Sequence, residues 1–144
     1  MTGGTFNYTI DMIKHNKKKS KNESCNYTVI FYDLPDGTEP VADFLNEIPL
    51  KMSAKILRTI GLLEEFGLAL REPYSSPLGD GIFELRTKIG SDITRVLYFF
   101  IVGKRVVLTH GFVKKTQATP PEEIEKAKRY RKEYLSRLEE KGDR

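Results

Sequence analysis

Hydrophobic residues recur along the chain with two different periods, and each period predicts a different kind of element. Residues 27–32 form a short run rich in β-branched and aromatic side chains, which predicts a strand that ends at the turn signal of residues 34–37. Apolar positions then follow helical spacing over residues 40–48 and 50–66, with Pro49 between the two stretches and Gly67 after them. The first half of the chain therefore predicts a strand followed by a helical hairpin.

The second half predicts three consecutive strands and a final helix. A loop containing Pro73 and Pro77 precedes strands expected over residues 82–88, 93–102 and 105–113. Their connections are short, so the strands must pair antiparallel as a meander. Residues 119–122, Thr-Pro-Pro-Glu, predict a capping box with Thr119 as the N-cap of a helix whose apolar stripe runs from Ile124 to Leu138.

The expected order is thus β-αα-βββ-α, an α+β fold with a mainly antiparallel central sheet, an N-terminal helical hairpin and a C-terminal helix. The chain has 144 residues, the size of one ordinary domain. We place this domain at residues 26–141. Residues 1–25 are polar and lack sustained periodicity, which predicts a flexible basic tail, either a non-functional extension or an arm that adds nonspecific attraction to RNA.

Charge changes this picture only locally. The net charge of the chain is +4, but residues 1–25 hold five lysines against Asp11 and Glu23, a net +3, so the predicted domain itself is nearly neutral. The overall charge is therefore weak evidence for nucleic-acid binding, and what matters is whether basic residues gather on one face of the domain.

Several classes of protein are disfavoured by composition. No apolar run approaches the roughly 20 residues of a membrane helix, and no signal peptide is visible at the start. A single cysteine, Cys25, and no secretion signal predict a cytoplasmic protein. The histidines, His15 and His110, lie far apart in sequence, so no metal site and no cofactor are expected.

The strands carry the candidate chemistry. Because side chains alternate across a strand, Glu84, Arg86 and Lys88 share one face of the first meander strand. Arg95 lies with Leu97 and Phe99 on the second strand, and parity places His110 with Leu108 and Phe112 on the third. In a plausible register four basic residues converge on one side of the sheet, although charged residues in strands can also simply face solvent. These four are Arg86, Arg95, His110 and Lys114.

Three sequence segments resemble the RelE/HigB toxin superfamily, in its phage-derived HigB-like branch. Residues 77–86 (PLGDGIFELR) are similar to the family's L-x-x-G-L-x-E-L-R segment, and residues 95–99 (RVLYF) resemble its R-V-L-Y strand. Residues 110–120 (HGFVKKTQATP) look like its H-G-F-x-K-K-T-x-x-T-P signature. The resemblance covers roughly residues 27–138, with the three segments in the expected order.

The resemblance implies the toxin of a type II toxin–antitoxin system, a metal-independent endoribonuclease that cuts messenger RNA in the ribosomal A site by attack of a 2′-OH on its phosphodiester. It implies a cognate antitoxin, commonly a helix-turn-helix protein, as partner. In this chemistry Arg86 and Arg95 would hold the phosphate, Lys114 would stabilise charge or act as the acid, and His110 would be a candidate base. We expect RNA contacts from Lys88, Lys104, Arg105, Lys115 and Gln117.

Other interpretations remain open at this stage. His110 can be structural, and Glu84 can be a base or can pair with Arg86, Arg95 or Lys88. Tyr98 can stack on a base but, by parity, is expected in the core. The same superfamily contains ParE-like toxins that bind DNA gyrase, and a regulator that binds nucleic acid without cutting it is a third possibility.

Overall fold

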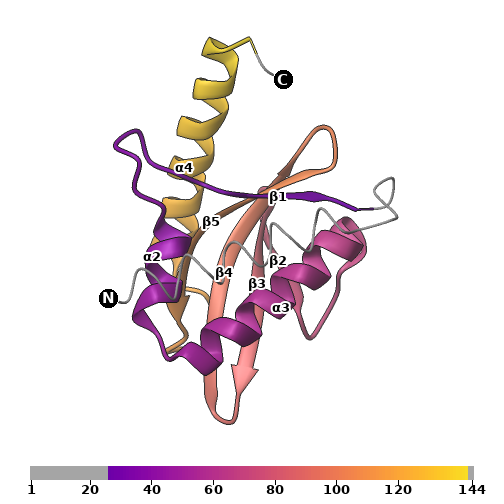
Figure 1. The fold of residues 1–144 in the computed structure, drawn as a ribbon, viewed down its shortest axis with the longest axis vertical. Helices are drawn as coiled ribbons and strands as arrows, with labels where there is room; N and C mark the ends of the chain where they lie inside the picture. Colours follow the sequence, from indigo (N-terminus) through magenta and orange to yellow (C-terminus); the bar gives the residue numbers. More distant parts are fainter. Residues whose placement is uncertain (1–25, 143–144) are drawn as a thin grey trace.

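The computed structural model describes residues 26–142, so the predicted tail at 1–25 lies outside the described residues. One five-stranded sheet forms the middle layer, with helices on both of its faces (Figure 1). No helix in the described part is long and apolar enough to cross a bilayer. In chain order the elements are β1 (Thr28–Phe31), α2 (Pro40–Glu47), α3 (Leu50–Phe66), the 3-10 turn η2 (Gly67–Ala69), β2 (Ser75–Gly79), β3 (Ile82–Ile89), β4 (Asp92–Ile101), β5 (Arg105–Val113) and α4 (Pro121–Glu140).

The predicted α+β class, the helical hairpin and the meander are confirmed. The strand order across the sheet is β1-β5-β4-β3-β2, and only the β1–β5 pair is parallel. The sheet is therefore mainly antiparallel, as expected.

The predicted order of elements was wrong at one point, because the loop containing Pro77 is strand β2. It pairs antiparallel with β3, Ser75 opposite Leu85, and has a register shift between Pro77 and Gly79. Proline has no N–H to donate to a ladder, and an edge strand tolerates it because one side of the strand is unpaired. The sheet thus has five strands rather than four.

The two faces of the sheet carry two separate cores. Helices α2 and α3 cover one face, where Ile56, Ile60 and Leu63 pack against Leu85 and Val96. Helix α4 covers the other, with Ala127 among Ile82, Leu97, Phe99 and Val107. Part of α4 extends beyond the sheet, and its Tyr130 and Tyr134 contact Tyr32 just after β1 (Figure 1).

A bulge in β5 changes which residues face α4. Leu97 is opposite His110, whereas the next residue, Tyr98, is opposite Leu108, so Thr109 is the extra residue of β5. His110 and Phe112 consequently lie on the α4 face, and Leu108 belongs to the core under α2 and α3. The parity argument that placed His110 and Leu108 on one face was wrong for this reason.

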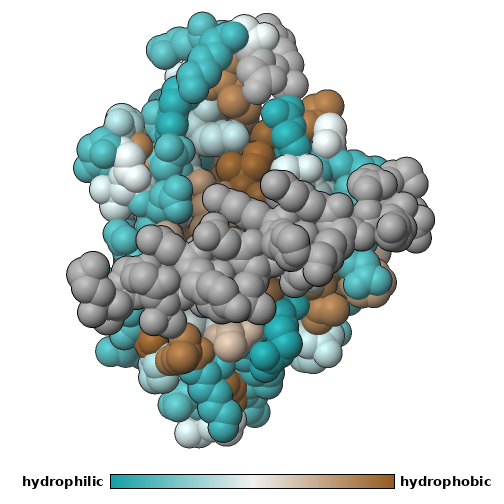
Figure 2. Space-filling view, in the orientation of Figure 1, coloured by the Kyte–Doolittle hydropathy of each residue, from teal (hydrophilic) through white to brown (hydrophobic). Residues whose placement is uncertain are grey.

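Most of the surface visible in Figure 2 outside the grey atoms is hydrophilic, and hydrophobic residues appear there in separate patches. Large hydrophobic side chains that are exposed in the described part come from several elements rather than one face. They are Leu50, Phe66, Leu68, Tyr74, Val102, Val113 and Leu135.

Candidate active site

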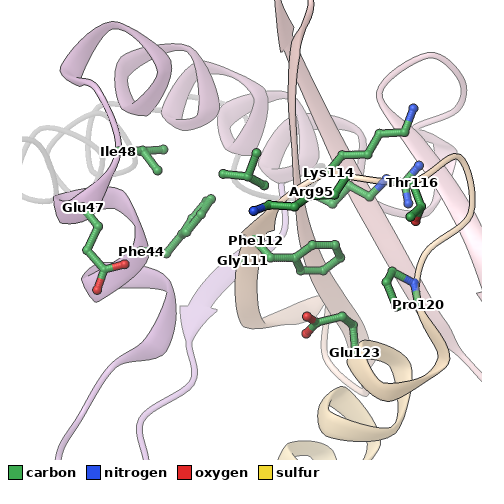
Figure 3. Close-up of a pocket in the computed structure, with 12 residues that line it drawn as sticks. Phe44, Glu47, Ile48, Arg95, Gly111, Phe112, Lys114, Thr116, Pro120 and Glu123 are labelled. Atoms are coloured by element: carbon green, nitrogen blue, oxygen red, sulfur yellow. The ribbon is translucent and has the colours of Figure 1, made fainter.

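A pocket of about 650 Å³ opens at the carboxyl end of β5, between α2 and the first turn of α4 (Figure 3). Such a volume lies within the range of small-molecule sites, roughly 300–1,000 Å³. Its walls combine aromatic rings with charges of both signs. The lining residues are Phe44, Glu47, Ile48, Arg95, Gly111, Phe112, Val113, Lys114, Lys115, Thr116, Pro120 and Glu123.

The pocket exists because β1 is shorter than β5. The parallel pairing ends with Phe31 opposite Leu108, so among the described residues the rest of β5 has no strand neighbour on that side. Helix α2 takes this place, and the Phe44 ring packs directly on the backbone of Gly111. A Cβ at Gly111 would lie 2.5 Å from Cδ2 of Phe44, which no ordinary contact allows. Glycine in the H-G-F segment is therefore a packing requirement of the pocket wall.

Arg95 holds the segment after β5 against the sheet. Its guanidinium donates to the hydroxyl of Thr119 and to the carbonyl of Gln117, both at 2.7 Å, and its Nε lies 3.4 Å from Oε1 of Glu84. The residue is only 2% exposed. Arg95 thus lines the pocket while its Nη1 and Nη2 already have hydrogen-bond partners and its Nε faces Glu84.

Glu84 is shared between the two strand arginines. Its side chain, 6% exposed, lies 3.6 Å from Nε of Arg86 and also accepts a hydrogen bond from Thr119. Arg86 forms a second ion pair with Glu72 and does not line the pocket. The interpretation that Glu84 pairs with Arg86 and Arg95 is confirmed for both, and the expectation that Arg86 joins a common phosphate site needs correction, because two carboxylates already hold its charge.

His110 lies beneath the pocket rather than in it. Burial lowers its pKa to about 4, so the ring is neutral near pH 7. Nε2 is 2.9 Å from Oε1 of Glu123, and Nδ1 is 3.1 Å from the hydroxyl of Thr109. A carboxylate only accepts, so in the neutral ring Nε2 donates to Glu123 and Nδ1 is an acceptor that faces the hydroxyl of Thr109, whose single proton also has the Leu97 carbonyl within reach at 3.1 Å. With both nitrogens engaged and 3% exposure, His110 is poorly placed to act as the base.

Lys114 and Lys115 are the basic residues at the pocket that are most open to solvent. The backbone of Lys114 continues the β5–β4 ladder by donating to the carbonyl of Ile93, which fixes its position. Its Nζ donates to Oε1 of Gln117 at 2.9 Å. Lys115 is exposed. The structure therefore brings Arg95, Lys114 and Lys115 to one pocket, with Gln117 beside them.

Lys104 and Arg105 lie at the opposite end of β5. At roughly 3.4 Å per residue, Arg105 lies on the order of 20 Å along β5 from Gly111, the first pocket residue of this strand. Arg105 donates to the carbonyl of Val102, and Lys104 lies over the Tyr27 ring. Lys88 is exposed, opposite Ile93 near the β3–β4 turn, and does not line the pocket. Lys104 and Arg105 therefore lie too far away to contact the same small ligand as Lys114, whereas Lys88 lies two strands from Lys114 at the same end of the sheet.

Phe44 and Glu123 are among the pocket residues that were not singled out from the sequence. Phe44 was expected only as part of a helical stripe, and Glu123 only as part of the last helix. The signal for Phe44 is Gly111, whose missing side chain requires a close neighbour. No local signal marks Glu123, because its position depends on α4 packing beside the β5 bulge. Tyr98, by contrast, is 1% exposed, in the core as expected.

The fold places this chain among small α+β proteins, and a comparison with known families is more specific. The model of the family "Phage derived protein Gp49-like (DUF891)" matches residues 43–132, more than half of the chain, and the chain belongs to this family. The family is part of the RelE/HigB toxin-like superfamily of type II toxin–antitoxin systems. No curated protein matches the chain.

Proposed function

We propose that this protein is the toxin of a HigB-like type II toxin–antitoxin pair and cuts messenger RNA on the ribosome. Membership of the Gp49-like family suggests a toxin with an antitoxin partner. The observation that carries the nuclease proposal is the pocket itself, where Arg95 from β4 and Lys114 and Lys115 from the end of β5 line one opening. In this proposal residues 26–141 are the toxin domain, acting in the cytoplasm.

The proposed reaction needs positive charge around one phosphodiester. The 2′-OH of a nucleotide attacks the adjacent phosphorus, and the products are a 2′,3′-cyclic phosphate and a 5′-OH. Negative charge grows on the phosphoryl oxygens in the transition state, and preorganised cations stabilise it most effectively. Lys114 and Lys115 supply ammonium groups at the opening, and Arg95 supplies a guanidinium fixed by Thr119 and Gln117.

The remaining predicted residues take supporting roles in this proposal. Arg86 positions Glu84 and, through it, Arg95. Lys88 and Gln117 flank the opening at the same end of the sheet. Lys104 and Arg105, at the far end, are suited to ribosomal RNA rather than to the scissile nucleotide, because RNA backbones offer phosphate contacts over a wide surface. A helix-turn-helix antitoxin is the proposed partner that restrains the toxin.

The test is cleavage of a defined message on purified ribosomes. The wild type is expected to produce new 5′-OH ends within the codon in the A site, and Lys114→Ala is expected to slow cleavage by about 10²-fold or more, the loss typical of one stabilising group. Lys132→Ala on the exposed face of α4 is the matched control and should cleave at the wild-type rate. A message with a 2′-deoxy nucleotide at the cut site should stay intact.

Two results would overturn this proposal. The first is an intact message on programmed ribosomes with folded wild-type protein. The second is equal cleavage by Lys114→Ala and Lys132→Ala. This result would mean that the pocket takes no part in the cleavage reaction, although the protein would still be a toxin that cuts RNA.

One observation favours a second function, a ParE-like toxin that binds DNA gyrase. Glu72 and Glu84 already pair with the two strand arginines, and such pairing is consistent with a fold that has no need to grip phosphate. Growth arrest with intact transcripts and damaged DNA after induction would support this alternative. New transcript ends that vanish in Lys114→Ala would exclude it.

A further inference from the structure

Glu123 is an acidic residue within a pocket that also contains three basic residues. It belongs to the first turn of α4, and its side chain is 26% exposed. Figure 3 shows it below Phe112, across the opening from the α2 residues Phe44 and Glu47. A carboxylate that reaches such an opening can meet a substrate there.

One oxygen of this carboxylate is fixed from below. Oε1 accepts the Nε2 proton of His110, at 2.9 Å, and His110 is itself held by Thr109 and by the rings of Phe112 and Tyr130. A buried, neutral histidine that donates to a carboxylate orients it without neutralising it. The hydrogen bond from His110 therefore gives the Glu123 carboxylate a fixed position, which a proton acceptor requires.

We propose that Glu123 is the general base of the RNA cleavage reaction and that His110 is its positioning residue. This inference rests on the proposed nuclease function and adds a role that the strand residues do not fill. Arginine and lysine near the opening are cations and cannot accept a proton, and Glu84 is buried between Arg86 and Arg95.

The proton and electron balance of the step is complete with residues of this chain. Glu123 takes the proton of the 2′-OH while the 2′-oxygen forms a bond to phosphorus. The bond from phosphorus to the 5′-oxygen breaks, and that oxygen receives a proton from the ammonium of Lys114. The products are the cyclic phosphate and a 5′-OH, and solvent returns the two residues to their starting states.

The charges around Glu123 are mixed. Arg95 from β4 lines the pocket together with Lys114 and Lys115, which follow β5, and α2 presents Glu47. On its own helix Lys126 and Arg129 are close enough to act on His110. The cations favour binding of the phosphodiester next to the carboxylate.

Glu123→Gln is the decisive variant, because the amide has the same shape and its oxygen still accepts the His110 hydrogen bond, but it cannot accept a proton at neutral pH. We expect the single-turnover cleavage rate on programmed ribosomes to fall at least ~100-fold, the lower limit for a general base. Ribosome binding, measured by co-sedimentation, should remain. Glu122→Gln, an exposed neighbour outside the pocket, is the matched control and should cleave normally.

The outcomes separate this inference from the function on which it rests. If the wild type leaves the message intact, the nuclease proposal itself fails. If the wild type cleaves and Glu123→Gln cleaves equally fast, Glu123 is only structural and the inference is overturned. Should Glu123→Gln not fold, Glu123→Asp decides, since it retains a carboxylate and is expected to cleave measurably, whereas a folded but completely inactive Glu123→Asp with normal ribosome binding would contradict the assignment.

Discussion

His110 illustrates how one residue's surroundings determine its protonation. It sits on the α4 face of β5, and burial lowers its pKa from 6.5 to about 4. A protonated ring would have to lose its hydration beside the α4 residues Lys126 and Arg129, which also oppose the charge. The neutral ring is thus part of the native state.

A pH dependence of stability follows from this pKa. Between pH 6.5 and about 4 the unfolded chain binds a proton at His110 and the folded chain does not, so the free energy of unfolding falls as the pH is lowered through this window. His110 contributes at most about 1.4 kcal/mol per pH unit to the slope of the unfolding free energy against pH. Above pH 6.5 both states are neutral and the contribution is constant.

Urea denaturation at pH 7, 6 and 5 tests this prediction. His110→Gln keeps a side-chain donor toward Glu123 but does not titrate, so its unfolding free energy should depend less steeply on pH than that of the wild type. Carboxylates titrate in both proteins and cancel in the comparison. Parallel pH profiles for the two proteins would show that His110 is not the group responsible.

At the scale of elements, the contact between α2 and β5 sets the shape of the pocket. Gly111→Ala would force a methyl group into the Phe44 ring and is expected to destabilise the fold by about 1–3 kcal/mol, as overpacked cores do. Gly61→Ala is an informative control in α3, because none of the described residues, 26–142, lies within 4 Å of a Cβ there, and alanine favours a helix by ~0.5–1 kcal/mol. Chemical denaturation should show opposite signs for the two changes, and a neutral Gly111→Ala would contradict the packing argument.

The elements also show what local patterns can and cannot predict. The helical stripes and the meander were predictable because each carries several apolar residues at the right period. Strand β2 was missed because its five residues, SSPLG, include proline and glycine and only one large apolar side chain, Leu78. The signal that was available is Asp80-Gly81, which joins β2 and β3 as a two-residue turn with positive φ at both residues, the geometry of a tight hairpin.

The prediction of a capping box at the start of α4 was wrong, because Thr119 forms hydrogen bonds with residues of the sheet instead. The helix begins at Pro121, its N-cap is Pro120, and no side chain caps it. The hydroxyl of Thr119 instead accepts from Arg95 and donates to Glu84. A sequence window around residue 119 contains neither partner, so the competition between local capping and the sheet could not be resolved from the pattern. The β5 bulge escaped the parity argument in the same way, since register depends on the neighbouring strand.

At the scale of the whole molecule, one polar network joins segments that are distant in sequence. Glu72 before β2 pairs with Arg86 on β3, Glu84 bridges Arg86 and Arg95, and Arg95 holds the segment that leads to α4. The sequence predicted these residues as a phosphate site because it showed cations on one face. It left open that Glu84 pairs with these arginines, and it did not show that Glu72, from the loop before β2, would pair with Arg86.

This network predicts that removing its central carboxylate is far more costly than removing its outer one. Glu84→Ala would leave two largely buried arginines without a shared partner, which typically destabilises a fold by about 3–5 kcal/mol. Glu72→Ala, at a side chain that is 64% exposed, should cost less than about 1 kcal/mol. Urea denaturation of both variants measures the difference. Because Arg95 also anchors residues 117 and 119, Glu84→Ala should in addition increase proteolytic cleavage between β5 and α4 under native conditions. Equal and small losses of stability for the two substitutions would contradict the prediction. They would mean that the arginines bind water or other acceptors as readily as they bind Glu84.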